Sequence, residues 1–208
     1  MGQKVSPKAI RLKMSESWKS LWFSDKKYSD QVVEDIKIKS RLSKELKSAF
    51  LSDITIDRDA NTITINIFSS RPGVIIGRGG SGSEKIKKLI ENKSRSRVKV
   101  NIFEVKKPDI DPEIVAQSVA LQLEKRFPFR RAIKQALEKS RDAGAKGVRI
   151  QVAGRLNGAD IARREKVQFG TIPLSSFDKE IKYGTAHALT TYGIIGVKVW
   201  IYLGEGRK

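Results

Sequence analysis

A glycine-rich stretch at residues 73–80 carries the side chains best suited to contact with phosphate. It reads GVIIGRGG and ends in Gly77, Arg78, Gly79 and Gly80, and the segment that follows, SGSEKIKKLIENK, has the pattern of a basic helix. Glycine lets the backbone approach a phosphate and present bare N–H groups, while Arg78 and the lysines downstream supply positive charge. The spacing predicts a loop that cradles a sugar-phosphate backbone.

The charge balance of the chain indicates a polyanionic partner. Lys plus Arg number 42 and Asp plus Glu number 23, which leaves a net charge of +19 and a pI near 10.2. Such a charge repels itself in the folded state unless nucleic acid or an anionic membrane surface compensates it. No apolar stretch approaches the roughly 20 residues that span a bilayer, and the first residues lack the apolar run of a secretory signal. The sequence favours nucleic acid over membrane, and we expect a cytoplasmic protein.

No set of side chains in the sequence makes a convincing catalytic or metal centre. Cysteine is absent, so disulfides and thiolate metal sites are excluded. Asp109, Asp111 and Glu113 form an acidic cluster, which helix capping and linker solvation explain better than a metal does. His187 is the only histidine and has no identifiable catalytic partner. We expect a protein that is not an enzyme and takes no metal, cofactor or small-molecule substrate.

The residues around the glycine loop show alternating helical and strand periods. Residues 29–50 have a helical pattern, and residues 54–67 alternate about the turn DRDANT as a half-buried antiparallel hairpin. Ser81 and Glu84 fit a capping box at the start of the helix behind the loop, and residues 98–102 alternate as a third strand. The apolar side chains expected to turn the first helix toward the core are Val32, Ile36, Leu42, Leu46 and Phe50.

This order of elements, with an I-G-x-x-G motif at residues 76–80, resembles the type II K-homology (KH) domain. The resemblance implies that the GXXG loop clamps about four nucleotides of single-stranded backbone. Gly77, Gly79 and Gly82 also satisfy the dinucleotide motif G-x-G-x-x-G, with Glu104 about 20 residues on, but an antiparallel hairpin precedes them and no repeated strand-helix units follow. A P-loop is excluded because Ser83 stands where its phosphate-binding lysine belongs.

The second half of the sequence predicts two helices backing an antiparallel sheet. Apolar residues fall at helical spacing over 116–127 and again over 129–140, and alternation resumes over 148–152 and 197–203. Arg130, Arg131 and Lys134 share a helical face turned away from the apolar stripe, which the charge of the whole chain assigns to RNA backbone rather than to solvent alone. Between the strands, the segment GRLNGADIARREK has the composition of a projecting loop or hairpin. We expect its basic residues, Arg155, Arg163, Arg164 and Lys166, to touch phosphate.

Fifteen residues without an acid open the chain, and we expect residues 1–16 to form an extended basic arm that becomes ordered on a polyanion. Its cations are Lys4, Lys8, Arg11 and Lys13. Trp18, Trp22 and Phe23 follow the arm. They could stack on bases, but we expect them to anchor the arm on its own domain because exposed aromatic side chains need a partner.

Five segments together resemble the bacterial third small-subunit ribosomal protein family over the whole chain. They are MGQKVSP, RPGVIIGRGG, FRRAIKQAL, GAKGVRIQVAGRLNGADIAR and HALTTYGIIGVKVWIYLGEG. The resemblance implies a protein of the small-subunit head that binds ribosomal RNA, neighbours the tenth and fourteenth small-subunit proteins, and lines the channel through which messenger RNA enters. It also implies that Arg130, Arg131 and Lys134 face incoming messenger and help to unwind it. Relatives usually have two basic residues between the loop glycines where this chain has GRGG, so we expect a weaker single-strand grip.

The expected fold is α+β with two domains. A basic arm over residues 1–16 precedes a type II KH domain over 17–106, with a three-stranded sheet and helices, and a C-terminal two-helix and antiparallel-sheet domain over 107–208. The short segment VKKPDIDPE connects the domains, with Asp111 as the cap of the next helix and Pro112 in its first turn. The leading function hypothesis is a structural ribosomal protein, and the alternative is a free-standing RNA chaperone or messenger-binding regulator that uses the same KH loop.

Overall fold

Two separate hydrophobic cores divide the chain. The computed structural model describes residues 5–59, 62–91 and 97–205, with Trp18–Lys106 in one unit, while the segment up to Ser17 joins the residues from Lys107 onward in the other. Each unit combines helices with its own four-stranded sheet. The predicted α+β class, with a KH domain followed by an antiparallel sheet and helices, is confirmed. None of the helices in the described ranges is long and apolar enough to cross a membrane.

The first unit has the element order of a type II KH domain. Strands β2 and β3 are antiparallel, β4 adds parallel to β3, and the short β1 adds parallel to the other side of β2. The elements, in chain order, are β1 (Ser20–Leu21), α2 (Tyr28–Glu45), η1 (Lys47–Ala49), β2 (Leu51–Arg58), β3 (Thr62–Ser69), α3 (Pro72–Ile76), η2 (Arg78–Gly80), α4 (Ser81–Glu91) and β4 (Arg97–Glu104).

Alternation along β2 and β3 builds the core of this unit. Ile56, Ile65 and Ile67 are fully buried on the sheet face that meets the helices, while their neighbours along each strand are partly exposed. Helix α2 meets this core through Asp35, Ile38 and Leu42. The prediction that Ile36 faces the core is wrong, because the buried stripe of α2 includes Asp35 and leaves Ile36 61% exposed.

Asp35 is buried because several donors saturate its carboxylate. Arg58 on β2 donates to Asp35 Oδ1 from Nε (2.9 Å) and Nη2, and Trp22 Nε1 donates to Oδ2 at 2.8 Å. Only one of the three aromatic residues near the arm is therefore anchored as expected. Trp18 is 53% exposed and Phe23 is 86% exposed, which corrects the prediction that all three anchor the arm on its own domain.

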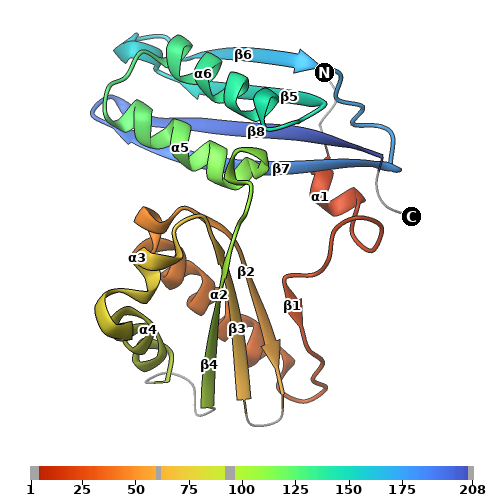
Figure 1. Ribbon diagram of the computed structural model, residues 1–208, viewed down its shortest axis with the longest axis vertical. Helices are drawn as coiled ribbons and strands as arrows, with labels where there is room; N and C mark the ends of the chain where they lie inside the picture. Colours follow the sequence, from red (N-terminus) through yellow and green to blue (C-terminus); the bar gives the residue numbers. More distant parts are fainter. Residues whose placement is uncertain (1–4, 60–61, 92–96, 206–208) are drawn as a thin grey trace. The chain divides into compact units, whose positions relative to one another are not determined.

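The second unit is an antiparallel sheet with two helices side by side over one face (Figure 1). The strands lie in the order β6-β5-β8-β7, and all three pairings are antiparallel. Asp111 caps α5 by accepting hydrogen bonds from the backbone N–H groups of Glu113 (2.9 Å) and Ile114 (3.3 Å), as predicted. The elements are α1 (Pro7–Ile10), η3 (Pro108–Ile110), α5 (Pro112–Glu124), α6 (Phe129–Asp142), β5 (Gly147–Gly154), η4 (Leu156–Gly158), β6 (Arg163–Gly170), β7 (Lys179–Thr190) and β8 (Gly193–Glu205).

The described part of the arm is folded rather than extended. Residues 7–10 form the short helix α1, which packs near β7, and Arg11 directly after it is fully buried. The prediction of an extended arm is wrong for these residues, since local charge and Pro7 do not reveal the carbonyl groups that lie around Arg11. Lys4 lies outside the described residues.

Candidate nucleic-acid interface

The glycine loop joins α3 to α4 through backbone that side chains rarely adopt. Gly77, Gly79 and Gly80 have φ values of 68°, 60° and 83°, in the region that favours glycine. The loop is one short 3₁₀ turn between helices, and α4 begins directly after it at Ser81. Its backbone N–H groups and the first turn of α4 therefore lie together, which is the arrangement that binds anionic oxygens.

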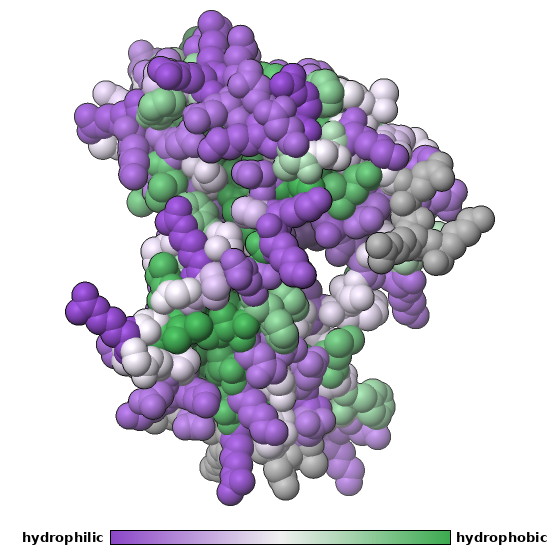
Figure 2. Space-filling view, viewed as in Figure 1, coloured by the Kyte–Doolittle hydropathy of each residue, from purple (hydrophilic) through white to green (hydrophobic). Residues whose placement is uncertain are grey.

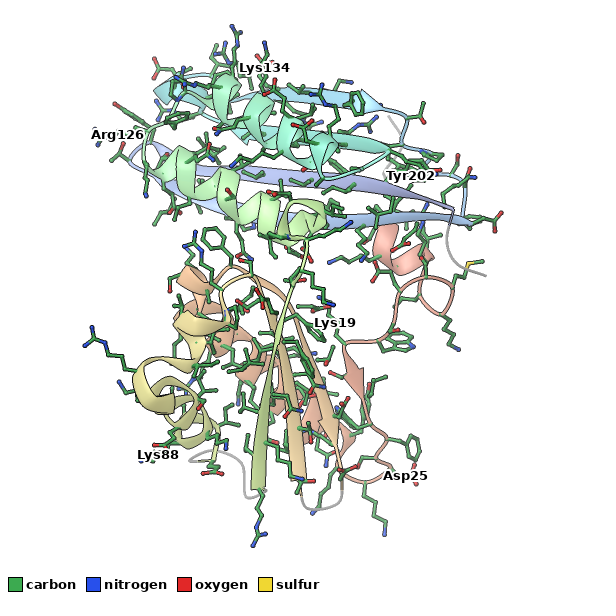
Figure 3. The ribbon with its side chains drawn as sticks, viewed as in Figure 1. Lys19, Asp25, Lys88, Arg126, Lys134 and Tyr202 are labelled. Atoms are coloured by element: carbon green, nitrogen blue, oxygen red, sulfur yellow. The ribbon has the colours of Figure 1, made fainter. Side chains whose placement is uncertain are left out.

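Positive charge surrounds this loop. Arg78 is exposed and has no ion-pair partner among residues 5–59, 62–91 and 97–205. Helix α4 adds exposed Lys85, Lys87 and Lys88, and Figure 3 shows Lys88 projecting outward from the helix. Ile86 and Ile90 bury the opposite face of α4 in the core. The loop therefore stands beside exposed cations that have no ion-pair partner within the described part of the chain, on one side of a helix anchored in the core.

Helix α6 presents a second basic surface. The stripe predicted to face the core is buried, including Phe129, Ile133 and Ser140. The opposite face, with Arg130, Arg131 and Lys134, is therefore exposed. Hydrophilic side chains cover the outer surface of this helix (Figure 2), and Lys134 projects away from it (Figure 3). The Arg130 side chain is 75% exposed. Its 3.9 Å ion pair with Glu165 is solvent-exposed and therefore contributes little to stability. All three cations are available to a polyanion.

Two aromatic rings hold part of this basic surface in place. The guanidinium of Arg130 lies 5.7 Å from the ring centroid of Phe129, and that of Arg163 lies 5.9 Å from the same ring. Arg131 lies 5.5 Å from the Phe127 ring. These cation–π contacts orient guanidinium groups without neutralising them. The structure therefore brings Arg163 to the α6 surface, a proximity that its predicted place on a loop or hairpin did not include.

The basic segment after β5 is not a projecting loop as a whole. Arg163, Arg164 and Lys166 lie on the edge strand β6, which pairs antiparallel with β5 as a hairpin. Successive strand residues point to opposite faces, so Arg164 and Lys166 face away from the side that holds Arg163. Of the two predicted alternatives, a loop or a hairpin, the pairing of β5 with β6 supports the hairpin.

The sheet face away from the helices carries further cations, Arg149 and Lys198, which were not among the predicted RNA contacts. In the register of the sheet, Gln151 stands between Lys166 on β6 and Lys198 on β8. Arg149 lies on the same face and donates to Gln168 Oε1 at 3.0 and 2.7 Å. The strand alternation around Arg149 and Lys198 was the signal that could have found them, once the edge strand was placed beside β5.

Two cations of the arm have structural partners instead of solvent. Arg11 is fully buried and donates to four backbone carbonyl oxygens, two of them at 2.8 Å, and burial lowers its pKa while Glu16 opposes that effect. The prediction that Arg11 contacts RNA is therefore wrong for this conformation, because no donor of its guanidinium faces solvent. Lys8 pairs with Glu113 Oε1 at 3.1 Å, whereas Lys13 is exposed. The four acceptors of Arg11 are the carbonyls of Pro7, Leu174, Ser176 and Lys179.

Arg155 also acts within the fold. Its Nε donates to the carbonyl of Ala159 at 2.9 Å, and its Nη2 pairs with Asp160 at 2.8 Å. The guanidinium lies 5.7 Å from the ring centroid of Tyr192. Arg155 is partly buried, so it shapes the segment around η4 as well as adding charge to it.

The described side chains do not assemble a catalytic constellation. Among the residues that the structure describes, no group of three or more His, Cys, Asp or Glu side chains is arranged to hold a metal. His187 is exposed on β7, and Asp111 and Glu113 are engaged as a helix cap and as an ion-pair partner. What the arrangement offers is a set of exposed, mostly unpaired cations on rigid elements, which is suited to binding phosphate.

Comparisons with protein families agree with this division into units. Residues 37–110 match the KH domain, and residues 119–201 match the C-terminal domain of ribosomal protein S3. The first match covers the glycine loop and its flanking helices, and the second covers α6 and the sheet.

Individual relatives resemble the chain over nearly its full length. It is 49% identical over 205 residues to the small ribosomal subunit protein uS3 of Halalkalibacterium halodurans, which covers 99% of this chain and 94% of the relative. Identity to the uS3 protein of Legionella pneumophila (strain Lens) is 50% with the same coverage. Identity to the uS3 protein of Lactobacillus helveticus is 47%, and the match covers 99% of this chain and 92% of the relative.

Proposed function

The chain belongs to the uS3 family of small ribosomal subunit proteins, and from this premise we propose that it lines the path of incoming messenger RNA with helix α6 and holds ribosomal RNA with its other basic surfaces. Membership makes it a structural ribosomal protein with a KH domain rather than an enzyme, with its place on the ribosome in the cytoplasm. The observation that carries the proposal is the outward cluster of three exposed cations on α6, in which Arg130 makes one weak surface pair with Glu165.

The α6 surface suits a moving single strand. Arg130, Arg131 and Lys134 are exposed on a helix whose other face is locked into the core, so their backbone positions are fixed while their tips stay free. Contacts to phosphate do not depend on the base sequence. A surface along which every messenger passes needs this independence of sequence.

We assign ribosomal RNA to two further surfaces. The first is the loop of Gly77, Arg78, Gly79 and Gly80, whose Gly77 N–H donates to the Gly73 carbonyl at 3.0 Å, so that the Arg78 side chain and the remaining loop backbone favour a single-stranded backbone. The second is the outer sheet face, where Lys166 and Lys198 flank Gln151 beside Arg164. Lys4 and Lys13 of the arm are further proposed contacts to ribosomal RNA. Lys8 can contact RNA only where the RNA displaces its ion pair with Glu113.

The proposed protein neighbours are the tenth and fourteenth small-subunit proteins. The support in this chain is the exposed aromatic surface before α2, where Trp18 and Phe23 remain open to solvent. Exposed aromatic side chains on a basic protein are suited to bury against another protein, because aromatic residues supply much of the contact energy at interfaces.

Translation through structured messenger tests the α6 assignment. Replacing Arg130, Arg131 and Lys134 together by Ala should slow reading through a stable hairpin at the channel more than it slows reading of unstructured messenger. The matched control replaces Lys37, Arg41 and Lys44, three exposed cations of α2, and removes the same charge from the other unit. Equal speed of the α6 variant and the control on the hairpin messenger would overturn the assignment, provided both assemble into the subunit.

A further inference from the structure

A hollow of about 440 Å³ lies at one end of the second unit, where three turns meet. The turn between α5 and α6, the η4 segment and the turn between β7 and β8 each contribute a wall. Buried Leu123, Leu156 and Ile195 form the floor, and the partly exposed rings of Phe127 and Tyr192 stand at the rim. The volume lies in the range of small-ligand sites, about 300–1,000 Å³.

The ring of Tyr192 is held rigidly although it is 58% exposed. It rests on Gly158, where φ is 77° and an added Cβ would lie 2.9 Å from Tyr192 Cε2. The Arg155 guanidinium lies 5.7 Å from the ring centroid and is itself fixed by Ala159 and Asp160. Both contacts come from one short segment, residues 155–158, and they leave more than half of Tyr192 open to solvent. The exposed part of a ring that is already positioned is a surface for stacking that needs little ordering when a ligand arrives.

The charge at the rim selects an anionic ligand. Arg126 projects from the end of α5 (Figure 3), and Arg131 lies over the Phe127 ring. The acidic side chain in the lining is Glu124, whose Oε1 accepts the backbone N–H of Leu189 at 3.1 Å. Guanidinium groups therefore surround an apolar, aromatic hollow in which the carboxylate already has a partner.

Unusual backbone conformations coincide with this hollow. Arg126 and Asn157 are two of the four non-glycine residues with positive φ among those that the structure describes, at 59° and 56°. Such conformations cost free energy and persist where the surroundings impose them, which occurs often at ligand sites. They hold the Arg126 side chain and the η4 segment at the rim.

We propose that this hollow binds one unstacked base of single-stranded RNA, with the base stacked on Tyr192 and the adjoining phosphates at Arg126 and Arg131. The inference rests on the proposed function, because Arg131 belongs to the α6 surface assigned to messenger. A strand that follows Arg130 and Arg131 reaches the rim directly, since Phe127 and Phe129 flank the same turn. Capturing a base beside the phosphate track keeps a newly opened strand from pairing again.

The test measures binding of the full-length chain to an unstructured RNA oligonucleotide that contains 2-aminopurine. Tyr192→Leu should weaken binding about 5- to 100-fold, in keeping with the contribution of one stacked base. Tyr192→Phe should retain the affinity, because it keeps the ring. The control Tyr28→Leu removes a tyrosine of similar exposure, 59%, from the other unit and should change little. The salt dependence should be the same in all variants because none alters charge.

Replacing each base in turn by an abasic sugar locates the captured position. One abasic position should weaken binding to the wild-type chain and have no further effect on Tyr192→Leu, since both changes remove the same stacking. If Tyr192→Leu fails to fold, photocrosslinking of a 5-iodouridine oligonucleotide to the unmodified chain answers the question, and a crosslink mapped to Tyr192 is expected.

The outcomes separate this inference from the function on which it rests. A wild-type chain that binds no RNA overturns both. The base pocket alone is overturned if Tyr192→Leu and Tyr28→Leu bind RNA equally, or if crosslinks are confined to other sites. The remaining candidate occupant of the hollow is then a peptide of a neighbouring protein.

Discussion

Arg11 should be a structural tether, so removing its guanidinium should unsettle the second unit and not merely weaken RNA binding. The informative change is Arg11→Met, which keeps an apolar stem of similar length and removes all four hydrogen bonds to Pro7, Leu174, Ser176 and Lys179. The matched control is Lys13→Met, which removes one positive charge from an exposed position two residues away.

The magnitude follows from the two shortest bonds, those to Ser176 and Lys179 at 2.8 Å. Hydrogen bonds from a charged donor contribute about 1.5–3 kcal/mol each to stability, which gives about 3–6 kcal/mol for the pair. When the segment before β7 moves, water can reach the carbonyl groups and replace part of the lost hydrogen-bond energy. We therefore expect the free energy of unfolding to fall by about 3 kcal/mol. At about 3–6 °C per kcal/mol for a unit of this size, the melting temperature of the second unit should fall by about 9–18 °C.

Amide hydrogen exchange measured beside thermal unfolding resolves this effect within a two-unit protein. Arg11→Met should lose protection along β7 and the residues before it, while the KH unit keeps its exchange rates and Lys13→Met resembles the wild type. If Arg11→Met is no less stable than Lys13→Met and instead loses RNA affinity alone, Arg11 is an RNA ligand and the tether account is wrong.

Two further changes test other parts of the structure. Arg78→Glu at the glycine loop should weaken binding of single-stranded RNA about tenfold in a titration at moderate salt, while Arg41→Glu, the same charge reversal on α2, should have a much smaller effect; equal effects would contradict a specific role for the loop. Asp35→Ala should destabilise the KH unit by about 3 kcal/mol in urea unfolding, because buried Arg58 loses the acceptor of its Nε and Nη2 groups and keeps only the pairing of Nη1 with Glu34, and Asp30→Ala on the exposed side of the same helix should cost little. The joint change Asp35→Leu with Arg58→Met should recover stability, and a joint variant as unstable as Asp35→Ala would argue against unsatisfied donors of Arg58 as the cause.

Local patterns predicted much of the fold because they depend on neighbours in sequence. The alternation of isoleucines gave β2 and β3, and the helical stripe through Phe129 and Ile133 gave the buried face of α6. Asp111 was recognisable as a helix cap because capping is decided within three residues. With the buried stripe of α6 known, the outward direction of Arg130 and Lys134 followed without further information.

The errors concern residues whose environment comes from distant parts of the chain. Arg11 looks like one more cation of a basic arm, and only the folded chain brings the carbonyls of residues 174–179 around it. Asp35 is buried because Arg58, 23 residues away, pairs with it, whereas an apolar pattern selected Ile36. A sequence pattern built on hydrophobicity does not register a charged side chain that is buried through its partners.

The basic surfaces show the same limit. Arg163 and Arg164 are adjacent in sequence, but as neighbours on a strand they face opposite sides of the sheet. Lys166 and Lys198 are far apart in sequence, yet both stand beside Gln151 because β5 lies between β6 and β8. The number of cations was evident from the sequence, but their division among surfaces depends on strand order.

The salt dependence of RNA affinity tests the central claim most directly, namely that this chain acts by neutralising RNA backbone. Full-length protein is titrated with small-subunit ribosomal RNA from low to moderate salt, and the logarithm of affinity is plotted against the logarithm of salt concentration. The account predicts a steep negative slope, with about 0.7–0.9 for each phosphate contact and a sum of several contacts. A flat response, or an affinity no greater than that of an acidic protein of equal size, would contradict it.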